Sequence, residues 1–215
     1  MRATDAFGVS RGYEQYFGLV ESPFSLTPNT RFLFESESHA EALEQVTLAL
    51  RRREAITVIT GEVGTGKTML CRIIVQDLEP RTFISVISNP LLSTDDLLKQ
   101  LLVDFGLMPR GDARQATLTQ HEMVATLQRF MASLVPLRAH AIVLIDEAQH
   151  LRPEVLEQVR LLTNFETDSQ KLLQVVLVGQ LDLDQVLDRG DLRQLRQRIV
   201  TNLADVSLVW QADDP

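Results

Sequence analysis

The sequence predicts an α/β fold, with a mainly parallel sheet of about five strands and helices on both of its faces. Short runs that are apolar throughout, such as 141–145 and 172–178, are typical of strands buried on both sides. These runs alternate with segments of helical spacing, as expected for parallel strands joined by crossover helices. We therefore expect a ligand site at the carboxyl ends of the strands.

The expected elements follow one another without a repeat or a low-complexity tract. Ser93 with Asp96, and Thr119 with Glu122, have the spacing of capping boxes, and Gly106 is placed to end the first of these helices. Helices are expected at 38–53, 67–78, 93–105, 119–134, from Pro153 onward and at 192–199, and strands at 55–60, 82–87, 141–145, 172–178, 199–203 and, more weakly, 206–210.

We expect three segments in the chain: an N-terminal arm at 1–36, a core at 37–203 and a C-terminal remnant at 204–215. The arm contains most of the aromatic side chains, together with Pro23 and Pro28. Because proline fixes φ and removes a backbone donor, this composition predicts an extended, packed strap over the core.

Some rings of the arm have a second expected role. Tyr16, Phe17 and Phe24 are the candidates for walls of an adenine pocket, since a purine face stacks well on aromatic surface. We favour the strap as the main role of the arm and assign the adenine contact to one or two of these rings.

The composition agrees with one large domain in a reducing compartment. The 215 residues, 45% of them hydrophobic, are enough for a full core, whereas two domains would be cramped. The single cysteine, Cys71, cannot form a disulfide within the chain. We expect its side chain to be buried and to pack like a small apolar residue. No apolar run reaches the ~18 residues of a membrane span, and no signal-peptide core begins the chain, so a cytoplasmic location is expected.

The segment 60–68 has the pattern of a phosphate-binding loop between a strand and a helix. Its glycines let backbone N–H groups approach phosphate oxygens, Lys67 supplies a mobile positive charge, and the Thr68 hydroxyl is suited to Mg²⁺. A coincidental Gly-rich turn is disfavoured, because a strand and a helix flank the segment. The expected nucleotide contacts are Gly61, Glu62, Val63, Gly64, Thr65, Gly66, Lys67, Thr68 and Met69, of which Glu62 and Val63 only fill loop positions.

A second site follows the apolar run 141–145, which ends in Asp146 and Glu147. Asp146 is expected to hold Mg²⁺, directly or through water, while Glu147 orients and deprotonates an attacking water. Two carboxylates after a strand are a weak signal alone, since a polar strand end has the same pattern. Together with the loop at 60–68 they form a Walker A and Walker B pair, which predicts ATP as ligand, Mg²⁺ as metal and hydrolysis as reaction.

Two further candidates follow the next apolar strand. Gln180 ends that strand, at the position where a sensor of the γ-phosphate would lie between the two sites. An ordinary amide side chain at a strand end would give the same pattern, and we weigh the two interpretations equally. The segment 192–198 contains Arg193, Arg196 and Arg198. We expect Arg196 and Arg198, ahead of Arg193, to reach the γ-phosphate of a neighbouring subunit from the side of the domain away from their own loop, rather than to be only solvated.

Together these residues resemble the AAA+ ATPases, and more narrowly the ExeA-type secretion and pilus-assembly ATPases. The pattern is most similar to the MshM proteins, which serve the mannose-sensitive haemagglutinin (MSHA) pilus and are called the MSHA branch below. The resemblance covers about residues 16–200. Its specific segments are 17–19, 22–28, 61–68, 145–149, 161–167 and 192–199, with 27–30, 89–92 and 171–177 similar to the MSHA branch.

The resemblance implies a P-loop NTPase (AAA+) core and an ATP-driven accessory role in type II secretion or type IV pilus assembly. It also implies a homo-oligomer that works with assembly proteins at the bacterial inner membrane, to which the chain would bind peripherally through a partner. In these relatives a helical lid follows the arginine segment, and residues 201–215 do not resemble it. We therefore expect the lid to be largely missing, with weaker closure on nucleotide and impaired oligomerisation.

Two alternatives stay open. One is a DNA-binding AAA+ regulator of the transposition type, since related AAA+ ATPases coat DNA. The net charge of −8 disfavours nucleic acid as a partner, but Arg51, Arg52 and Arg53 could line a ring or filament interior instead of forming a solvated helix end. The other is a nucleotide-gated scaffold with negligible turnover, which the sequence does not separate from an ATPase.

Overall fold

The computed structural model describes residues 13–18, 20, 37–89, 91–109, 111, 118–168 and 170–204. The chain divides into two units, Met1–Phe34 and Glu35–Pro215. The ring of Phe24 and the strand-like segment at 206–210, both singled out in the sequence, lie outside the described residues.

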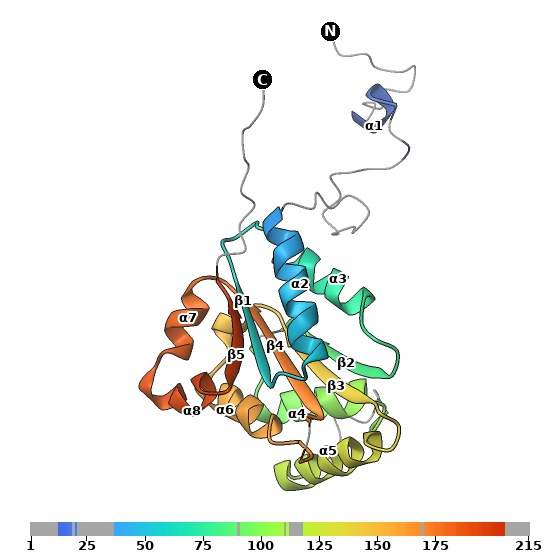
Figure 1. Ribbon diagram of the computed structural model, residues 1–215, viewed down its shortest axis with the longest axis vertical. Coiled ribbons are helices and arrows are strands. Elements are labelled where there is room, and N and C mark those ends of the chain that lie inside the picture. Colours follow the sequence, from blue (N-terminus) through green and yellow to red (C-terminus); the bar gives the residue numbers. More distant parts are fainter. Residues whose placement is uncertain are drawn as a thin grey trace. The chain divides into compact units, whose positions relative to one another are not determined.

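In the first unit, α1 (Tyr13–Tyr16) is a single helical turn (Figure 1). The amide of Phe17 donates to the carbonyl of Tyr13 at 2.9 Å, and the rings of Tyr16 and Phe17 meet edge to face with centroids 4.9 Å apart. The prediction of an extended strap is therefore wrong for these residues. Proline restricts itself and the residue before it, and Pro23 is too far along the chain to prevent this turn.

The second unit is built on a sheet of five strands in the order β2-β3-β4-β1-β5. Every pair of neighbouring strands is parallel, which confirms the predicted fold class. Because β4 lies between β1 and β3, the carboxyl ends of these strands are adjacent. The bounds are β1 (Ile56–Thr60), β2 (Thr82–Ile87), β3 (His140–Ile145), β4 (Leu173–Gly179) and β5 (Ile199–Leu203).

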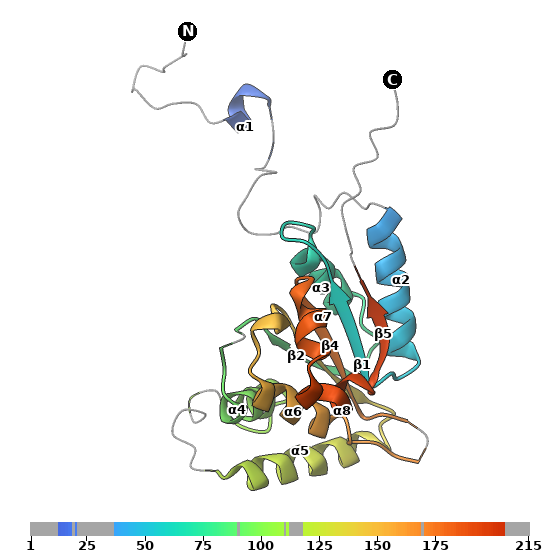
Figure 2. The same ribbon diagram turned by 90° about the vertical axis from the view of Figure 1, so that its left-hand side faces the viewer.

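Helices cover both faces of this sheet. Figures 1 and 2 show α2 and α3 on one face and α4, α5 and α6 on the other. The bounds are α2 (Glu37–Arg51), α3 (Lys67–Gln76), α4 (Thr94–Asp104), α5 (Gln120–Leu134), α6 (Pro153–Leu162), α7 (Asp182–Leu187) and α8 (Arg193–Arg196), with 3₁₀ turns η2 (Ala148–His150) and η3 (Gly190–Leu192).

Each central strand contributes side chains to two hydrophobic cores. In β3, Ile142 and Leu144 belong to the core under α2 and α3, while Val143 and Ile145 belong to the core under α4 and α6. Successive strand residues point to opposite faces, so a strand covered on both sides must be apolar at every position. This requirement explains the uninterrupted apolar runs in the sequence.

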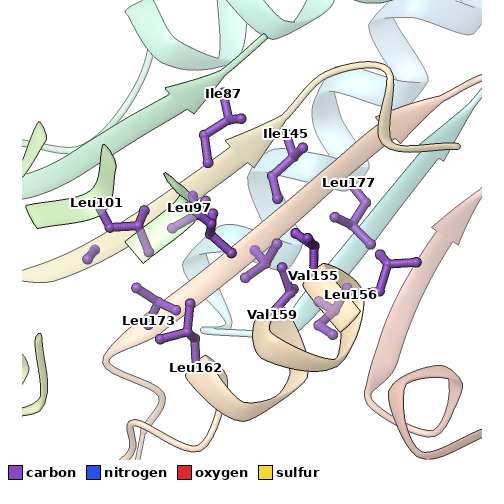
Figure 3. Packing of buried hydrophobic residues seen from close by; sticks show 14 of the residues in the cluster. Ile87, Leu97, Leu101, Ile145, Val155, Leu156, Val159, Leu162, Leu173 and Leu177 are labelled. Carbon is purple, nitrogen blue, oxygen red and sulfur yellow. The ribbon is translucent and has the colours of Figure 1, made fainter. Parts of the chain in front are cut away.

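The larger core lies between the sheet and the helices α4 and α6 (Figure 3). Leu97 of α4 and Val155 and Val159 of α6 point toward the sheet, where Ile145 and Leu177 meet them. Burying such a side chain fully contributes about 1.5–3 kcal/mol to folding. Packing against α4 and α6 fixes the positions of β3 and β4, and therefore also the positions of the residues that follow these strands.

Both predicted capping boxes are confirmed. The Ser93 hydroxyl accepts from the Asp96 amide at 3.2 Å, and the Asp96 carboxylate accepts from the Ser93 amide at 3.1 Å. The same exchange joins Thr119 and Glu122 at the start of α5. Hydrogen bonds from Ser93 hold the pKa of the Asp96 carboxyl below its usual range. Gly106, with φ of 74°, ends α4 as predicted.

The predicted helix at 192–199 is wrong in its extent. The chain forms η3 and then the short α8, which ends at Arg196. Ile199 is already paired with Ile56 in the sheet, so the helix has to end before it. The sequence reasoning also missed α7, whose buried face consists of Leu183 and Leu187. One such pair is too short a pattern to reveal a helix.

Within the described residues, none of the helices is long and apolar enough to cross a membrane.

Candidate active site at the carboxyl ends of the central strands

The loop between β1 and α3 turns at two glycines. Gly64 and Gly66 both have φ of 84°, a left-handed conformation in which a β-carbon is disfavoured. Gly66 is also the N-cap of α3 and has no side chain to bond the first N–H groups of the helix. The start of α3 therefore offers backbone donors and the positive end of the helix dipole to an anion, as the sequence predicts.

Hydrogen bonds within the chain shape the rest of this loop. The Gly61 amide donates to the carbonyl of Gly179 at 3.3 Å, which ties the loop to β4. The Thr65 hydroxyl donates to the carbonyl of Glu62 at 2.9 Å. Glu62 and Val63 are exposed, in agreement with the expectation that they only fill loop positions.

Lys67 is buried beneath the loop, with only 6% of its surface exposed. Its Nζ donates to the carbonyls of Gly61 at 2.8 Å and Glu62 at 2.6 Å. In the ligand-free chain these two carbonyls hold the ammonium, because a buried ammonium needs acceptors. An ammonium has three donors, so one more remains for a phosphate oxygen.

The loop meets the end of β3 through Thr68 and Asp146. The Thr68 hydroxyl donates to Oδ2 of Asp146 at 3.0 Å. Oδ1 of the same carboxylate accepts from the amide of Glu147 at 2.9 Å, and the Asp146 amide donates to the carbonyl of Ile87 at 2.9 Å. The carboxylate is thus held from both sides, at the position where the sequence predicts a metal ligand.

The oxygen atoms of Thr68 and Asp146 fit Mg²⁺, which binds through one or two protein oxygens and keeps waters and phosphate oxygens as its other ligands. In the described part of the chain, neither this site nor any other contains a group of three or more His, Cys, Asp or Glu side chains that could hold a metal ion. The nearby thiol of Cys71 does not suit Mg²⁺, which takes oxygen ligands. Burial and then the Asp146 charge raise the pKa of this thiol. Cys71 is buried and unpaired with another cysteine, as predicted.

Glu147 follows Asp146 in a left-handed conformation, with φ of 55° and ψ of 37°. This conformation is uncommon for a residue with a β-carbon. Oε2 of Glu147 accepts from Nε2 of Gln149 at 2.8 Å and lies 3.5 Å from Nε2 of Gln180. The structure therefore brings the predicted base and the predicted sensor together.

The sequence reasoning missed Gln149, which is buried with 7% of its surface exposed. Its Oε1 accepts from the amide of Gln180 at 3.2 Å, while its Nε2 donates to Glu147. The sequence signal for Gln149 is an amide side chain two residues after the acidic pair. This signal does not indicate that β4, which directly precedes Gln180, lies beside β3.

His39 of α2 is a second residue that the sequence reasoning missed. Only 2% of its surface is exposed, and its Nε2 lies 2.8 Å from the carbonyl oxygen of Thr65. A carbonyl only accepts, so this ring nitrogen bears a proton. A β-carbon on Gly66 would lie 3.1 Å from the same nitrogen. Helix α2 thus supports the loop from behind.

Arg196 forms ion pairs within its own domain. Its Nε pairs with Asp188 at 3.1 Å and its Nη1 with Asp184 at 3.9 Å. Asp184 also accepts from the hydroxyl of Thr60, the last residue of β1, at 3.4 Å. The short α8 packs beside α7, which the sequence did not predict, and this packing turns Arg196 toward its own domain.

The other arginines lie in different surroundings. Arg198 donates from Nη1 to the hydroxyl of Thr163, which follows α6, at 3.3 Å. Arg193 is exposed, and within the described residues it has no ion-pair partner. Of the cluster, Arg193 is the member most open to another molecule.

The basic segment at the end of α2 lies by the amino end of β1, at the opposite edge of the sheet from the loop. Arg51 pairs with Glu79 at 3.9 Å, and partial burial lowers the pKa of Arg53. These contacts favour the interpretation of a helix end over that of a free nucleic-acid surface.

Comparisons with known proteins agree with this geometry. The profile of a family described as "AAA domain" matches residues 50–187. The chain is 46% identical over 187 residues to General secretion pathway protein A of Aeromonas hydrophila. This alignment covers 87% of the chain and 33% of that protein, so the chain spans about a third of the length of this relative.

Solved structures share the fold. The ORC2 protein of Aeropyrum pernix, in ADPNP-ADP complexes, superposes with a TM-score of 0.62 at 18% identity, covering 85% of this chain and 50% of that one. Cdc6p from Pyrobaculum aerophilum superposes with a TM-score of 0.60 at 18% identity, covering 85% of this chain and 47% of that one. At this identity the likeness concerns the fold alone, and it supports the predicted core architecture.

Proposed function

Because the chain belongs to the AAA domain family, we propose that it binds ATP with Mg²⁺ and hydrolyses it at the ends of β1, β3 and β4. The observation that carries the proposal is the 3.0 Å hydrogen bond between Thr68 and Asp146. It joins the candidate phosphate loop to the candidate acidic site, so that one ion could contact both residues and the phosphates.

The loop residues would bind the nucleotide in two ways. The N–H groups at the start of α3, left uncapped by Gly66, donate to phosphate oxygens. Lys67 uses its remaining donor, or exchanges the carbonyls of Gly61 and Glu62 for oxygens of the ligand. His39 keeps the loop in shape by its bond to Thr65.

Thr68 and Asp146 would hold Mg²⁺, which when bound neutralises charge on the phosphate oxygens. Glu147 lies beside this position and takes a proton from a water aligned with the γ-phosphate, so that the resulting hydroxide attacks phosphorus and ADP leaves. Gln180, whose Nε2 is 3.5 Å from Glu147, is the proposed sensor of the γ-phosphate.

For the cellular role, we propose an accessory ATPase of type II secretion or of MSHA-like type IV pilus assembly. Support comes from the 46% identity to General secretion pathway protein A, within the 33% of that protein that the chain covers. The proposed partners are further copies of the chain and assembly proteins at the inner membrane, which would recruit the chain from the cytoplasmic side. The pattern at 27–30, 89–92 and 171–177 favours the MSHA branch.

Glu147→Gln tests the proposed chemistry, because it keeps the shape of the side chain and removes the base. ATP binding should persist while hydrolysis falls by roughly 10² or more, the scale of general-base removal. Glu154→Gln, a change of an exposed carboxylate in the first turn of α6, is the matched control and should hydrolyse ATP at the parent rate. A parent chain that binds ATP without turnover would instead identify a nucleotide-gated scaffold.

A further inference from the structure

The side chain of Gln149 links the ends of two neighbouring strands. It belongs to η2, just after β3, and bonds the backbone of Gln180 after β4 as well as the carboxylate of Glu147. Both bonds are formed by one amide group that is almost fully buried. Glu147 is therefore tied to β4 as well as to its own strand.

The chemistry of the groups determines how this amide is oriented. A backbone N–H can only donate, so the carbonyl oxygen of the Gln149 amide must face Gln180. The NH₂ group then points toward Glu147 and donates to its Oε2 at 2.8 Å. Among the described residues, the other oxygen of Glu147 accepts no hydrogen bond, so it remains available to a water molecule.

Gly179, the last residue of β4, makes room for this arrangement. A β-carbon added there would lie 2.6 Å from Oε1 of Gln149 and 2.9 Å from Cδ2 of Leu183. Contacts this short are not tolerated, so one of the neighbours would have to move. The amide of Gln149 therefore occupies a space that only glycine at this position leaves free.

We propose that Gln149 is a positioning residue for the water-activating carboxylate. Its NH₂ group holds Oε2 of Glu147, and the free oxygen Oε1 then takes the proton of the attacking water. Gln149 itself gains and loses no proton and acts only through Glu147. This inference rests on the proposed ATPase function.

If the buried amide of Gln149 served only to satisfy polar groups, its removal would affect binding and turnover in a different way. Its loss would loosen the ends of β3 and β4 and would affect nucleotide binding and turnover whatever residue stands at position 147. A positioning residue affects turnover only while Glu147 is present to be positioned. A double-mutant cycle separates these two roles.

The experiment compares Gln149→Met with the parent chain, because methionine has a similar length but no amide. Misplacing a catalytic group by about 1 Å can cost roughly 10²-fold in rate, so kcat should fall by about 10- to 100-fold. The Kd for ATP should stay within about twofold, because the hydrogen bonds of Gln149 among the described residues go to Glu147 and Gln180 and none goes to the loop at 61–66. In the Glu147→Gln background, the same change should leave the residual rate unaltered.

Gly179→Ala provides an independent second variant, since its β-carbon would displace Oε1 of Gln149 without removing the amide. We expect the same fall in kcat and the same dependence on Glu147. Gly190→Ala is the matched control, because a β-carbon there meets no atom within 4 Å. It should keep the parent rate.

The outcomes distinguish this inference from the proposed function. An unchanged kcat in Gln149→Met, or an equal fold-loss with and without Glu147, would overturn the positioning role while the ATPase function stands. A parent chain without turnover would overturn both. Circular dichroism and ATP affinity of each variant confirm that the fold and the loop persist.

Discussion

The hydroxyl of Thr68 and the Oδ2 atom of Asp146 are 3.0 Å apart, although 78 positions separate the two residues in the sequence. Thr68 lies in the first turn of α3, and Asp146 follows β3. The two strands that lead to them are separated in the sheet by β4. The bond therefore depends on the fold of the whole core.

Thr68→Ala and Asp146→Asn should both weaken the Mg²⁺ dependence of ATP binding. Thr68→Ala removes one of the two ligands that we assign to the ion, and Asp146→Asn removes the negative charge of the other. Loss of a side chain that only hydrogen-bonds to a metal ligand already costs about 10- to 100-fold in metal affinity, so we expect an effect of at least this size. The measurement is an ATP-binding titration at increasing Mg²⁺ concentration. Ser133→Ala, on the exposed side of α5, is the control. Parent-like Mg²⁺ curves in both site variants would refute the assignment.

Lys67→Met should raise the Kd for ATP at least roughly tenfold, the scale of losing one charge-assisted hydrogen bond of about 1.5–3 kcal/mol. It should also destabilise the ligand-free protein, because the buried carbonyl of Gly61 loses its donor, whereas the carbonyl of Glu62 keeps the Thr65 hydroxyl. An unsatisfied buried group costs about 1–3 kcal/mol. Isothermal titration and thermal unfolding measure the two effects. A folded Lys67→Met protein with parent affinity would contradict the proposed phosphate contact.

Hydrolysis per chain should rise with protein concentration if an arginine of one subunit completes the site of another. Arg196→Ala and Arg198→Ala should then bind ATP normally and hydrolyse it roughly 10³-fold more slowly, the lower range for arginine fingers. Mixing either variant with Glu147→Gln should restore part of the turnover. Arg193→Ala extends the test to the most exposed arginine.

Asp188→Asn is the control for Arg196, since it removes the own-chain partner at 3.1 Å and leaves the arginine in place. If Asp188→Asn reproduces the loss seen in Arg196→Ala, the arginine acts inside its own domain. A rate per chain that does not change with concentration, together with normal hydrolysis in all the arginine variants, would exclude the trans arrangement.

Ser93→Ala should reduce the free energy of unfolding at pH 7 by about 1 kcal/mol, the usual effect of losing an N-cap. Hydrogen bonds from Ser93 hold the folded-state pKa of Asp96 below its value in the unfolded chain, which is about 3.9. A lowered folded-state pKa contributes stability above the unfolded value and loses that contribution as pH falls through the folded value.

The difference between Ser93→Ala and the parent should therefore shrink as the pH is lowered below about 4. Urea unfolding at a series of pH values measures it, with Ser133→Ala as the control that removes a hydroxyl outside any capping box. A difference that is equal at all pH values would leave the cap effect intact but would contradict the role of the Asp96 charge.

Features with local causes were predictable from the sequence alone. The capping boxes at Ser93 and Thr119 need only residues three positions apart, and both are present. The apolar runs of β3 and β4 were found because strands buried on both faces are apolar at every position. The glycine pattern likewise predicted a tight loop between a strand and a helix, and the structure has such a loop between β1 and α3, with left-handed Gly64 and Gly66.

The tertiary structure alone decided which of these pieces meet. The order β3-β4-β1 brings Gln180 to Glu147 and places the Gln149 amide between them. Packing of α2 behind the loop brings His39 to Thr65. Gln149 and Glu147 are only two residues apart, but the contacts of Gln180 and of His39 join segments that are distant in the sequence. Residue spacing does not predict these long-range contacts, because strand order and helix packing set the distances.

Packing explains which partners the two positively charged side chains have in the ligand-free chain. The ammonium of Lys67 is enclosed by the fold, and its acceptors are carbonyls of its own loop. Arg196 pairs with Asp188 and Asp184, because α7, too short to be recognised in the sequence, presents carboxylates beside it. The sequence by itself determined which chemical groups the site contains. Only the folded chain determined their partners, since packing decides which acceptors lie within reach of each charged group.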